Sequence, residues 1–268
     1  MTELLKKIAD IVRDASRIMT DNEKRARITQ KGNASNYVTE ADTGIQQYLS
    51  QRLPSLIPGS TIVGEEDGQL DASGRYIWVI DPIDGTSNFI RDLGLSVISV
   101  GLIHDGKPYI GVIYHPYMDE MYCGEVGLGA FLNDKPIHVS DRDFAHSHLC
   151  SAMSLYDKRY AKPCFNIIEK VYSQSDDLRR LGSAALELAL LAAGKVELYF
   201  EMRVFAWDVA AAFAMIIAAG GYIECLHEDG LPLDRPFPII AANTEENFKK
   251  LKEIVVSEVP QTPYSERI

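Results

Sequence analysis

A run of apolar residues that ends in two carboxylates places the strongest constraint on how this chain can fold. The segment YIWVI at 76–80 is followed directly by Asp81, and Asp84 comes three residues later. A short continuous apolar run of this kind predicts a fully buried β-strand. Pro82 has no N–H for a strand ladder, so we expect the strand to stop at Asp81. Gly85 can adopt positive φ and predicts a tight turn directly after Asp84.

The residues after this turn favour the start of a helix and a site for an anion. Thr86, Ser87 and Asn88 are residue types that cap helix N-termini. The backbone N–H groups of Gly85, Thr86 and Ser87 would then point outward and could bind a phosphate. The two neighbouring carboxylates would repel that phosphate unless a hard cation such as Mg²⁺ lay between them. Each aspartate alone is compatible with an ordinary turn residue, but the combination indicates a metal–phosphate site.

The order of the predicted elements indicates an α/β protein with two halves. An amphipathic helix is predicted over Glu3–Thr20, a second helix begins near Thr39–Ala41, and strands follow up to about residue 137. The second half alternates, with helices predicted at 161–173, 183–193, 206–219 and 244–257 and strands at 177–181, 196–200, 222–226 and 239–242. This order predicts an α+β subdomain at 1–143, carrying most metal ligands, and an α/β subdomain at 144–268, carrying Asp208 and the substrate pocket.

Charge and cysteine content narrow the functional classes. The 268 residues carry a formal net charge of −11, which disfavours nucleic acid or an anionic membrane as a partner. The N-terminus has an amphipathic pattern instead of a signal peptide, and no apolar run approaches the roughly 18 residues that span a bilayer. Four dispersed cysteines without a C-x-x-C pair indicate free thiols. We therefore expect a cytoplasmic protein that binds neither nucleic acid nor membranes.

The acids at 65–67 and the single residue Asp208 have positions that would also suit a metal–phosphate site. The acids at 65–67 follow Gly64 at the end of a short predicted strand, where a solvated acidic turn is the ordinary interpretation. A glycine before them would nevertheless let one carboxylate turn into a cleft. Asp208 begins an otherwise apolar helix, where a first-turn aspartate stabilised by the helix dipole is the ordinary interpretation. An aspartyl-phosphate nucleophile of the D-x-D-G-T type is not expected, because Pro82 occupies its position.

Three segments in this order resemble the inositol monophosphatase family. The family pattern is G-E-E, then D-P-[IL]-D-G-T-x-N-F, and then W-D followed by a small-residue helix and a glycine pair. The chain has GEED at 64–67, WVIDPIDGTSNF at 78–89, AWDVAA at 206–211 and AAGG at 218–221. The resemblance covers essentially the whole chain. It implies a layered α/β/α/β/α sandwich, a homodimer, and a lithium-sensitive, Mg²⁺-dependent phosphatase.

The resemblance also implies which residues hold the metal. Glu65, Asp81 and the backbone carbonyl of Ile83 would bind one Mg²⁺. Asp81, Asp84 and Asp208 would bind a second, so that Asp81 bridges the two ions, and a third, weaker ion would lie near Glu65. Such oxygen ligands suit Mg²⁺, which prefers carboxylates and carbonyls and retains several waters.

Catalytic and phosphate-binding roles are implied in the same way. Glu65 and Thr86 would orient and activate the attacking water, and Asp42, in the segment VTEAD, would form a hydrogen bond with Thr86. The backbone amides of Gly85 and Thr86, with Ser87 beside them, would bind the phosphate.

The resemblance places the rest of the substrate pocket in the second half. The predicted substrate contacts are Asp84, Gly85, Thr86, Ser87, Gly182, Ser183, Ala184, Glu201, Arg203 and Asp208. An ordinary helix start capped by Ser183 explains Gly182–Ala184 equally well. The chain departs from the family at Arg203, where many members have glycine, and at Phe205, where a polar residue is usual. A cation at Arg203 could favour a substrate with a second phosphate, although a surface arginine is the ordinary interpretation.

The sequence therefore predicts a Mg²⁺-dependent phosphomonoesterase. It would hydrolyse a small sugar or cyclitol phosphate, such as inositol 1-phosphate, by metal-activated water and without a phosphoenzyme. Within the same class, the alternatives are a fructose-1,6-bisphosphatase and a 3′(2′),5′-bisphosphate nucleotidase. From a different class, the alternative is a regulatory protein that retains the fold and acts by binding a partner.

Overall fold

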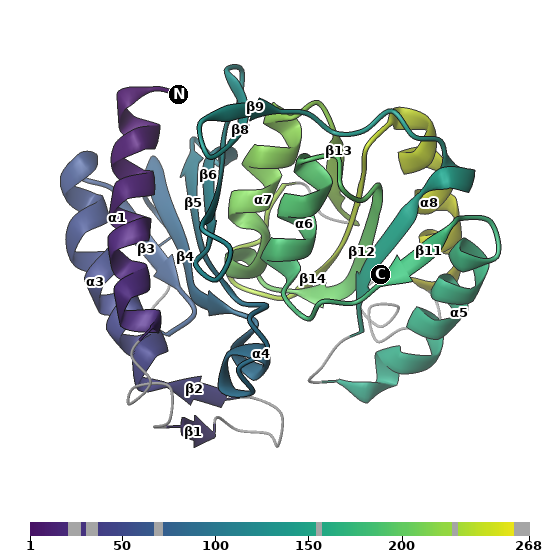
Figure 1. Ribbon diagram of the computed structural model, residues 1–268, viewed down its shortest axis with the longest axis horizontal. Coiled ribbons are helices and arrows are strands. Elements are labelled where there is room, and N and C mark those ends of the chain that lie inside the picture. Colours follow the sequence, from purple (N-terminus) through teal and green to yellow (C-terminus); the bar gives the residue numbers. More distant parts are fainter. Residues whose placement is uncertain (21–27, 31–36, 67–71, 154–156, 227–229, 260–268) are drawn as a thin grey trace.

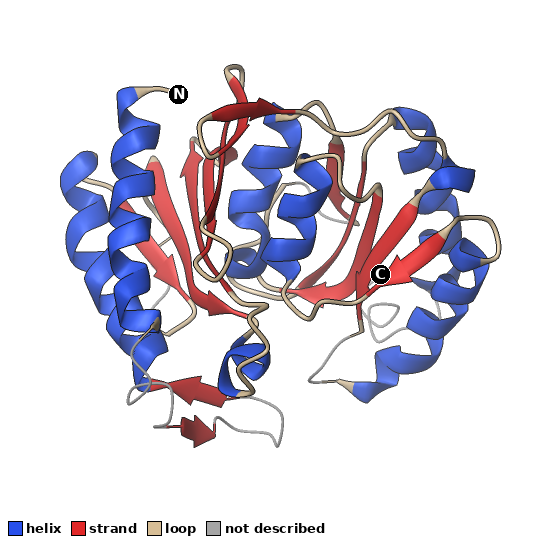
Figure 2. Ribbon diagram, viewed as in Figure 1, coloured by secondary structure: helices blue, strands red, loops and turns tan. Residues whose placement is uncertain are grey.

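The architecture is a stack of five layers in which helices alternate with sheets (Figures 1 and 2). The structure is a computed structural model, and it describes residues 1–20, 28–30, 37–66, 72–153, 157–226 and 230–259. A seven-stranded and a five-stranded sheet each have helices on both faces, and one pair of helices lies between the two sheets. The predicted α/β/α/β/α sandwich is confirmed. Among the described residues, no helix combines the length and the apolar composition needed to cross a lipid bilayer.

The first sheet contains seven strands in sequential order. They are β3 (Thr61–Gly64), β4 (Tyr76–Asp84), β5 (Val97–His104), β6 (Lys107–His115), β7 (Glu120–Glu125), β8 (Gly129–Leu132) and β9 (Lys135–Ile137). β3 runs parallel to β4, and all other neighbours are antiparallel. β4 is the predicted apolar strand, and it is buried from Ile77 onward. Its end, with both motif aspartates, therefore lies inside the layered structure.

The second sheet brings three parallel strand ends to one edge. Its order is β11-β10-β12-β14-β13, formed by β10 (His148–Ala152), β11 (Asp177–Arg179), β12 (Leu198–Val204), β13 (Tyr222–Cys225) and β14 (Phe237–Ala242). β10 is parallel to both β11 and β12, so the carboxyl ends of these three strands lie side by side. β10 was not predicted, and neither were β1 (Ile28–Gln30) and β2 (Tyr37–Thr39), which form a separate antiparallel pair.

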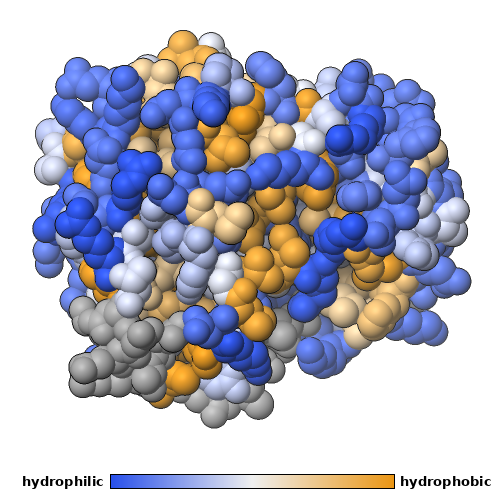
Figure 3. All heavy atoms as spheres, in the orientation of Figure 1, coloured by the Kyte–Doolittle hydropathy of each residue, from blue (hydrophilic) through white to orange (hydrophobic). Residues whose placement is uncertain are grey.

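The helices are placed by the faces that they bury. The α-helices are α1 (Glu3–Met19), α3 (Glu40–Leu56), α4 (Thr86–Ile90), α5 (Ala161–Tyr172), α6 (Ala184–Ala192), α7 (Ala206–Ala218) and α8 (Glu245–Glu258), with 3₁₀ turns at Phe144–His146 and Lys158–Tyr160. α1 and α3 cover the outer face of the first sheet, and α5 and α8 cover the outer face of the second. α6 and α7 form the middle layer. In Figure 3, which has the same orientation, hydrophobic side chains are visible over this layer.

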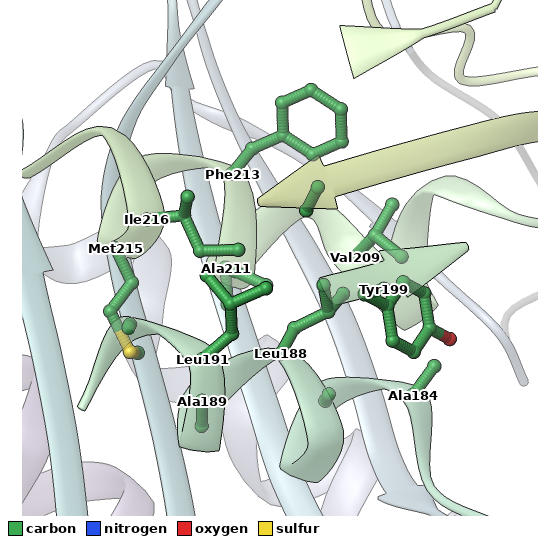
Figure 4. Close-up of a cluster of buried hydrophobic side chains, with 14 of the residues drawn as sticks. Ala184, Leu188, Ala189, Leu191, Tyr199, Val209, Ala211, Phe213, Met215 and Ile216 are labelled. Carbon is green, nitrogen blue, oxygen red and sulfur yellow. The ribbon is translucent and has the colours of Figure 1, made fainter. Parts of the chain in front are cut away.

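The middle layer forms one core from both halves of the chain. Leu188 of α6, Val209 of α7 and Tyr199 of β12 lie close together in Figure 4, and Tyr122 of β7 belongs to the same buried cluster. The predicted boundary at 143/144 separates the two sheets along the sequence, whereas this core joins them in space. The division into two subdomains stays a prediction.

A row of three glycines lets α7 lie directly on the first sheet. Gly101, Gly111 and Gly124 are cross-strand partners on β5, β6 and β7. A Cβ at Gly111 would lie 1.9 Å from the backbone oxygen of Ala211, and one at Gly124 would lie 2.5 Å from Cα of Met215. The helix backbone therefore contacts the sheet where side chains would otherwise keep it away. This contact fixes the position of α7 and of the acidic residue in its first turn.

We expect Gly111→Ala to lower the free energy of unfolding by about 3 kcal/mol, because the added methyl would overlap a backbone carbonyl of α7 and push the helix off the sheet. Urea denaturation followed by circular dichroism would measure the change. Gly44→Ala is the matched control, since Gly44 lies inside α3 and, among the residues that the structure describes, its Cβ would meet only a methyl of Ile18, at 3.3 Å. Alanine is favoured there by about 1 kcal/mol. Equal stability of the two variants would contradict the proposed contact.

Candidate functional site

An irregularity in β4 brings the two motif aspartates onto one face of the sheet. On a regular strand, side chains three residues apart point to opposite faces. In the pairing of β4 with β5, however, Asp81 lies opposite Ser99 and Asp84 lies opposite Val97. Two residues of β4 are therefore set against one residue of β5, which is a β-bulge. The extra residue turns the Asp84 side chain to the same face as that of Asp81.

The prediction that the strand stops at Asp81 is wrong, because β4 continues through Pro82 and Ile83 to Asp84. Pro82 lies in the bulge, where the strand ladder is interrupted and a missing N–H is tolerated. The N–H of Ile83 donates to Oδ1 of Asp81 at 3.0 Å. The bulge thus positions both carboxyl groups, and it supplies the Asp81 carboxylate with one hydrogen-bond donor.

The turn after β4 differs from the prediction in how its helix begins. Thr86–Asn88 are not the cap: α4 starts at Thr86, and its N-cap is Gly85, which has φ of 88° and no side chain to cap with. The Thr86 hydroxyl instead donates to the carbonyl of Ile83 at 3.1 Å. The first N–H groups of α4 have no acceptor within the helix, and this leaves them available for an anion.

Three carboxylates from two distant segments meet at the end of β4. Asp81, Asp84 and Asp208 each offer an oxygen, and these oxygens all lie within 4.8 Å of one another. Asp208 lies in the first turn of α7, where its Oδ2 accepts the N–H of Phe205 at 2.7 Å. Asp208 is therefore a first-turn aspartate of α7, which is the ordinary interpretation of its position in the sequence. It also belongs to the cluster of three carboxylates.

The N-cap and the first turn of α6 bind Asp84 from the second half of the chain. Ser183 Oγ donates to Oδ2 of Asp84 at 2.6 Å, and the N–H of Ala185 donates to the same oxygen at 2.7 Å. Asn88 of α4 donates to the carbonyl of Leu181 at 2.7 Å. The loop before α6 is therefore fixed against α4 and β4, and Asp84 is held with one of its oxygens already occupied.

Burial raises the pKa of all three carboxyl groups, and neighbouring acids raise that of Asp81 and Asp208 further. For Asp81, burial raises the pKa well above its usual value, and the charges of Glu65 and Asp84 raise it further. Burial raises the pKa of Asp84 to about 6, against the hydrogen bonds from the start of α6. Burial, followed by the charge of Asp84, raises the pKa of Asp208 to about 7. Within the described residues no lysine, arginine or histidine is ion-paired with the cluster, so a hard divalent cation fits it.

The cluster lies in a pocket that gathers most of the predicted site residues. Those that line it are Glu65, Asp81, Ile83, Asp84, Gly85, Thr86, Ser87, Gly182, Ala184, Glu201, Arg203 and Asp208. Glu65 lines the pocket but is not one of the three carboxylates that lie within 4.8 Å of one another. Asp67 lies outside the described residues. The two remaining predicted residues, Asp42 and Ser183, are buried behind the pocket wall.

Asp42 lies beneath Thr86, at the start of α3. It accepts hydrogen bonds from the backbone N–H of Thr39, at 2.8 Å, and from the Thr39 hydroxyl. The Thr86 hydroxyl lies 3.5 Å from its Oδ1, at the long end of hydrogen-bond distances. Burial raises the pKa of Asp42 to about 6. The structure thus brings Asp42 next to Thr86, while its catalytic role stays a prediction.

Glu201 faces the pocket from β12. It is 8% exposed and accepts a hydrogen bond from the hydroxyl of Tyr199 at 2.7 Å. Burial raises its pKa well above the usual value. A buried acid with one fixed donor has acceptor or donor capacity left for a hydroxyl of a bound molecule.

The pocket also contains residues that the sequence did not place there. They are Tyr37, Ala152, Met153, Arg180 and Phe205. Phe205 was noted only as a departure from the family pattern. Arg180 lies two residues before Gly182, the first of the predicted contacts in that segment, and this proximity was the available signal. Ala152 and Met153 lie at the end of the unpredicted strand β10, and Tyr37 belongs to the unpredicted strand β2.

Comparisons with known proteins agree with the geometry of this site. A model of the inositol monophosphatase family matches residues 1–260. Nus factor SuhB of Escherichia coli is 35% identical over 198 residues, 73% of this chain and 74% of that protein. The inositol-1-monophosphatase of Mesorhizobium japonicum is 34% identical over 200 residues, 74% of this chain and 75% of that protein.

A solved structure extends the likeness to the whole fold. The Thermotoga maritima IMPase superimposes with a TM-score of 0.84 at 27% sequence identity, and the match covers 97% of this chain and 99% of that one. The residues matched by the family model include those that form the carboxylate cluster and its pocket. The chain therefore belongs to the inositol monophosphatase family.

Proposed function

We propose that the protein is a Mg²⁺-dependent phosphomonoesterase that acts on a small sugar or cyclitol phosphate such as inositol 1-phosphate. One observation carries the proposal: three carboxylates without a paired cation among the described residues lie at the end of a buried strand, beside the first turn of α4. Membership of a metal-dependent phosphatase family and the inositol-1-monophosphatase name of a relative support the choice of substrate class.

The donor set fits Mg²⁺. Asp81, Asp84 and Asp208 would hold it together with Glu65 and the carbonyl of Ile83, as two to three ions, because this cation prefers oxygen ligands. When bound, Mg²⁺ lowers the pKa of water and offsets the negative charge of the phosphate. The same charge would stabilise the ionised form of the three aspartates, whose pKa burial raises in its absence.

The remaining roles belong to the chain itself. We propose that Thr86 and Glu65 orient the attacking water, with Asp42 holding Thr86 in place. The amides of Gly85, Thr86 and Ser87 would bind the phosphoryl oxygens; the Gly85 N–H also contacts the Asp84 carboxylate and lowers its pKa. The leaving alcohol would contact Gly182, Ala184 and Glu201, while Ser183, behind the pocket wall, would hold Asp84 in place. Catalysis of phosphoryl transfer depends mainly on such positioning of the reactants and on stabilisation of charge in the transition state.

The proposal predicts phosphate release from inositol 1-phosphate that requires millimolar Mg²⁺. We expect EDTA to lower the rate by at least about 100-fold and renewed Mg²⁺ to restore it, because a site of carboxylates cannot bind a phosphate dianion unaided. A malachite green assay would follow phosphate, with fructose 1,6-bisphosphate and adenosine 3′,5′-bisphosphate as comparison substrates. Equal turnover with and without Mg²⁺ would rule the mechanism out. Lithium inhibition and a homodimer belong to the same proposal and are checked by adding LiCl and by light scattering.

A second candidate is a regulatory protein that acts by binding a partner. It is favoured by the name of one relative, Nus factor SuhB, which is not the name of a phosphatase. The net charge of −11 argues against direct binding of nucleic acid. Absence of Mg²⁺-dependent turnover on the whole substrate panel would favour this candidate over the phosphatase.

A further inference from the structure

Two arginines line the pocket that contains the carboxylate cluster, and the charge of Arg203 acts on the Asp208 carboxylate and lowers its pKa. Arg180 directly follows β11, and Arg203 lies near the carboxyl end of β12. β10 lies between these strands and runs parallel to both, so the two arginines flank the end of β10 at one edge of the sheet. Strands two places apart are about 10 Å from each other. The long side chains of two arginines can therefore reach one group that lies above the end of β10.

Neither guanidinium has an ion pair or a hydrogen bond with any residue that the structure describes. Their neighbours behave differently: Arg179 pairs with Asp177, and Arg159 pairs with Asp157. In a chain with a net charge of −11, carboxylates for further pairs are plentiful. Two cations without such partners at one pocket are what an anionic ligand would complement.

Arg203 is also held in place by aromatic rings. Its guanidinium lies over the ring of Phe205, with Cζ 5.1 Å from the centroid. That ring stacks on Trp207, with centroids 4.6 Å apart and an interplanar angle of 6°. Stacking fixes the plane of a guanidinium and leaves its N–H groups free at the edge. The ring of Phe205 thus restricts where the Arg203 guanidinium can lie and leaves it hydrogen-bond donors for an anion.

We propose that Arg180 and Arg203 form a second anion subsite, which binds a phosphoryl group carried by the leaving group of the substrate. The inference rests on the proposed phosphatase function and specifies its substrate as a small bisphosphate. The cluster of Asp81, Asp84 and Asp208 would take the phosphoryl group that is hydrolysed. The two arginines would bind the one that stays on the product.

Matched substrate pairs test the subsite. The pairs are inositol 1-phosphate with inositol 1,4-bisphosphate, and fructose 1-phosphate with fructose 1,6-bisphosphate. We expect kcat/KM of the wild type to favour the bisphosphate in at least one pair by about tenfold or more. Arg180→Gln and Arg203→Gln should each lower that preference by about tenfold, the effect of losing one charge-assisted contact to a bound phosphate. Arg179→Gln is the control, because Arg179 pairs with Asp177 and does not line the pocket.

Two outcomes would overturn the subsite: no preference in either pair, or an equal loss on mono- and bisphosphate in both arginine variants. The second would mean that the arginines serve only as countercharges for the carboxylates. Binding affinity is measured without turnover by calorimetric titration of the protein with the same mono- and bisphosphates. The titration is done in the presence of Ca²⁺, which binds the same kind of oxygen ligands as Mg²⁺. Tighter bisphosphate binding that depends on both arginines, without phosphate release, would refute the proposed function and support the subsite. Phosphate release without any preference would refute the subsite alone.

Discussion

Replacing Asp84 with asparagine is expected to lower kcat for inositol 1-phosphate by about 1,000-fold, or about 4 kcal/mol in activation free energy. Ser183 Oγ and the N–H of Ala185 both donate to Oδ2 of Asp84. An asparagine would keep these two hydrogen bonds by placing its carbonyl oxygen there. Its NH₂ group would then occupy the position of the other oxygen and point into the carboxylate cluster, where it would repel a cation.

The fold of this variant should remain intact, which separates the loss of activity from unfolding. At pH 8 and without metal, Asp84→Asn should raise the melting temperature, because it removes one charge from a buried cluster of acids. Asp143→Asn is the matched control: Asp143 is exposed and caps a short 3₁₀ turn, where asparagine serves equally well. A variant at position 84 that retained a tenth of the wild-type rate would speak against a metal ligand at this position.

The motif of β4 shows which part of the site was predictable. The apolar run and the glycine identified a buried strand and a turn, and the family resemblance named the candidate metal ligands. The arrangement of Asp81 and Asp84 on one face did not follow, because a spacing of three on a regular strand predicts opposite faces. The bulge that reverses this is set by the pairing of β4 with β5, which is a tertiary contact. The residue pattern of β4 alone does not predict this bulge.

The same reason explains the residues that sequence analysis missed. β10 is a five-residue strand, HLCSA, with neither a long apolar run nor a regular alternation, and its position between β11 and β12 stabilises it. Arg180 and Phe205 enter the pocket only because these three strand ends lie side by side. The glycines at 101, 111 and 124 likewise form one row only through the register of β5, β6 and β7. Local patterns predicted most of the helices and strands, and the family resemblance implied their layers, whereas strand register determined which side chains meet.

The metal-free protein is expected to be less stable at pH 8 than at pH 5, which is the reverse of ordinary acid destabilisation. The pKa of Asp84 is raised from 3.8 to about 6, and that of Asp208 from 3.8 to about 7. The folded state therefore holds these protons more tightly than the unfolded state. The contribution of the bound protons to the free energy of unfolding is lost as the pH rises from 3.8 through 6 and 7. Between pH 5 and pH 8 the two groups together account for roughly 4 kcal/mol, or about 10 °C in melting temperature.

Mg²⁺ should reverse this dependence, because it binds ionised carboxylates and competes with their protons. At pH 8 millimolar Mg²⁺ should raise the melting temperature by about 10 °C, and at pH 5 it should raise it much less. Calorimetric scans at the two pH values, with EDTA and with Mg²⁺, measure all four states. The double variant Asp84→Asn/Asp208→Asn should lose most of both effects, since neither side chain can ionise or bind the cation. A metal-free wild type that melts at the same temperature at pH 5 and pH 8 would show that these carboxylates are not forced into one uncompensated cluster, and the cation-binding role of the cluster would lose its physical basis.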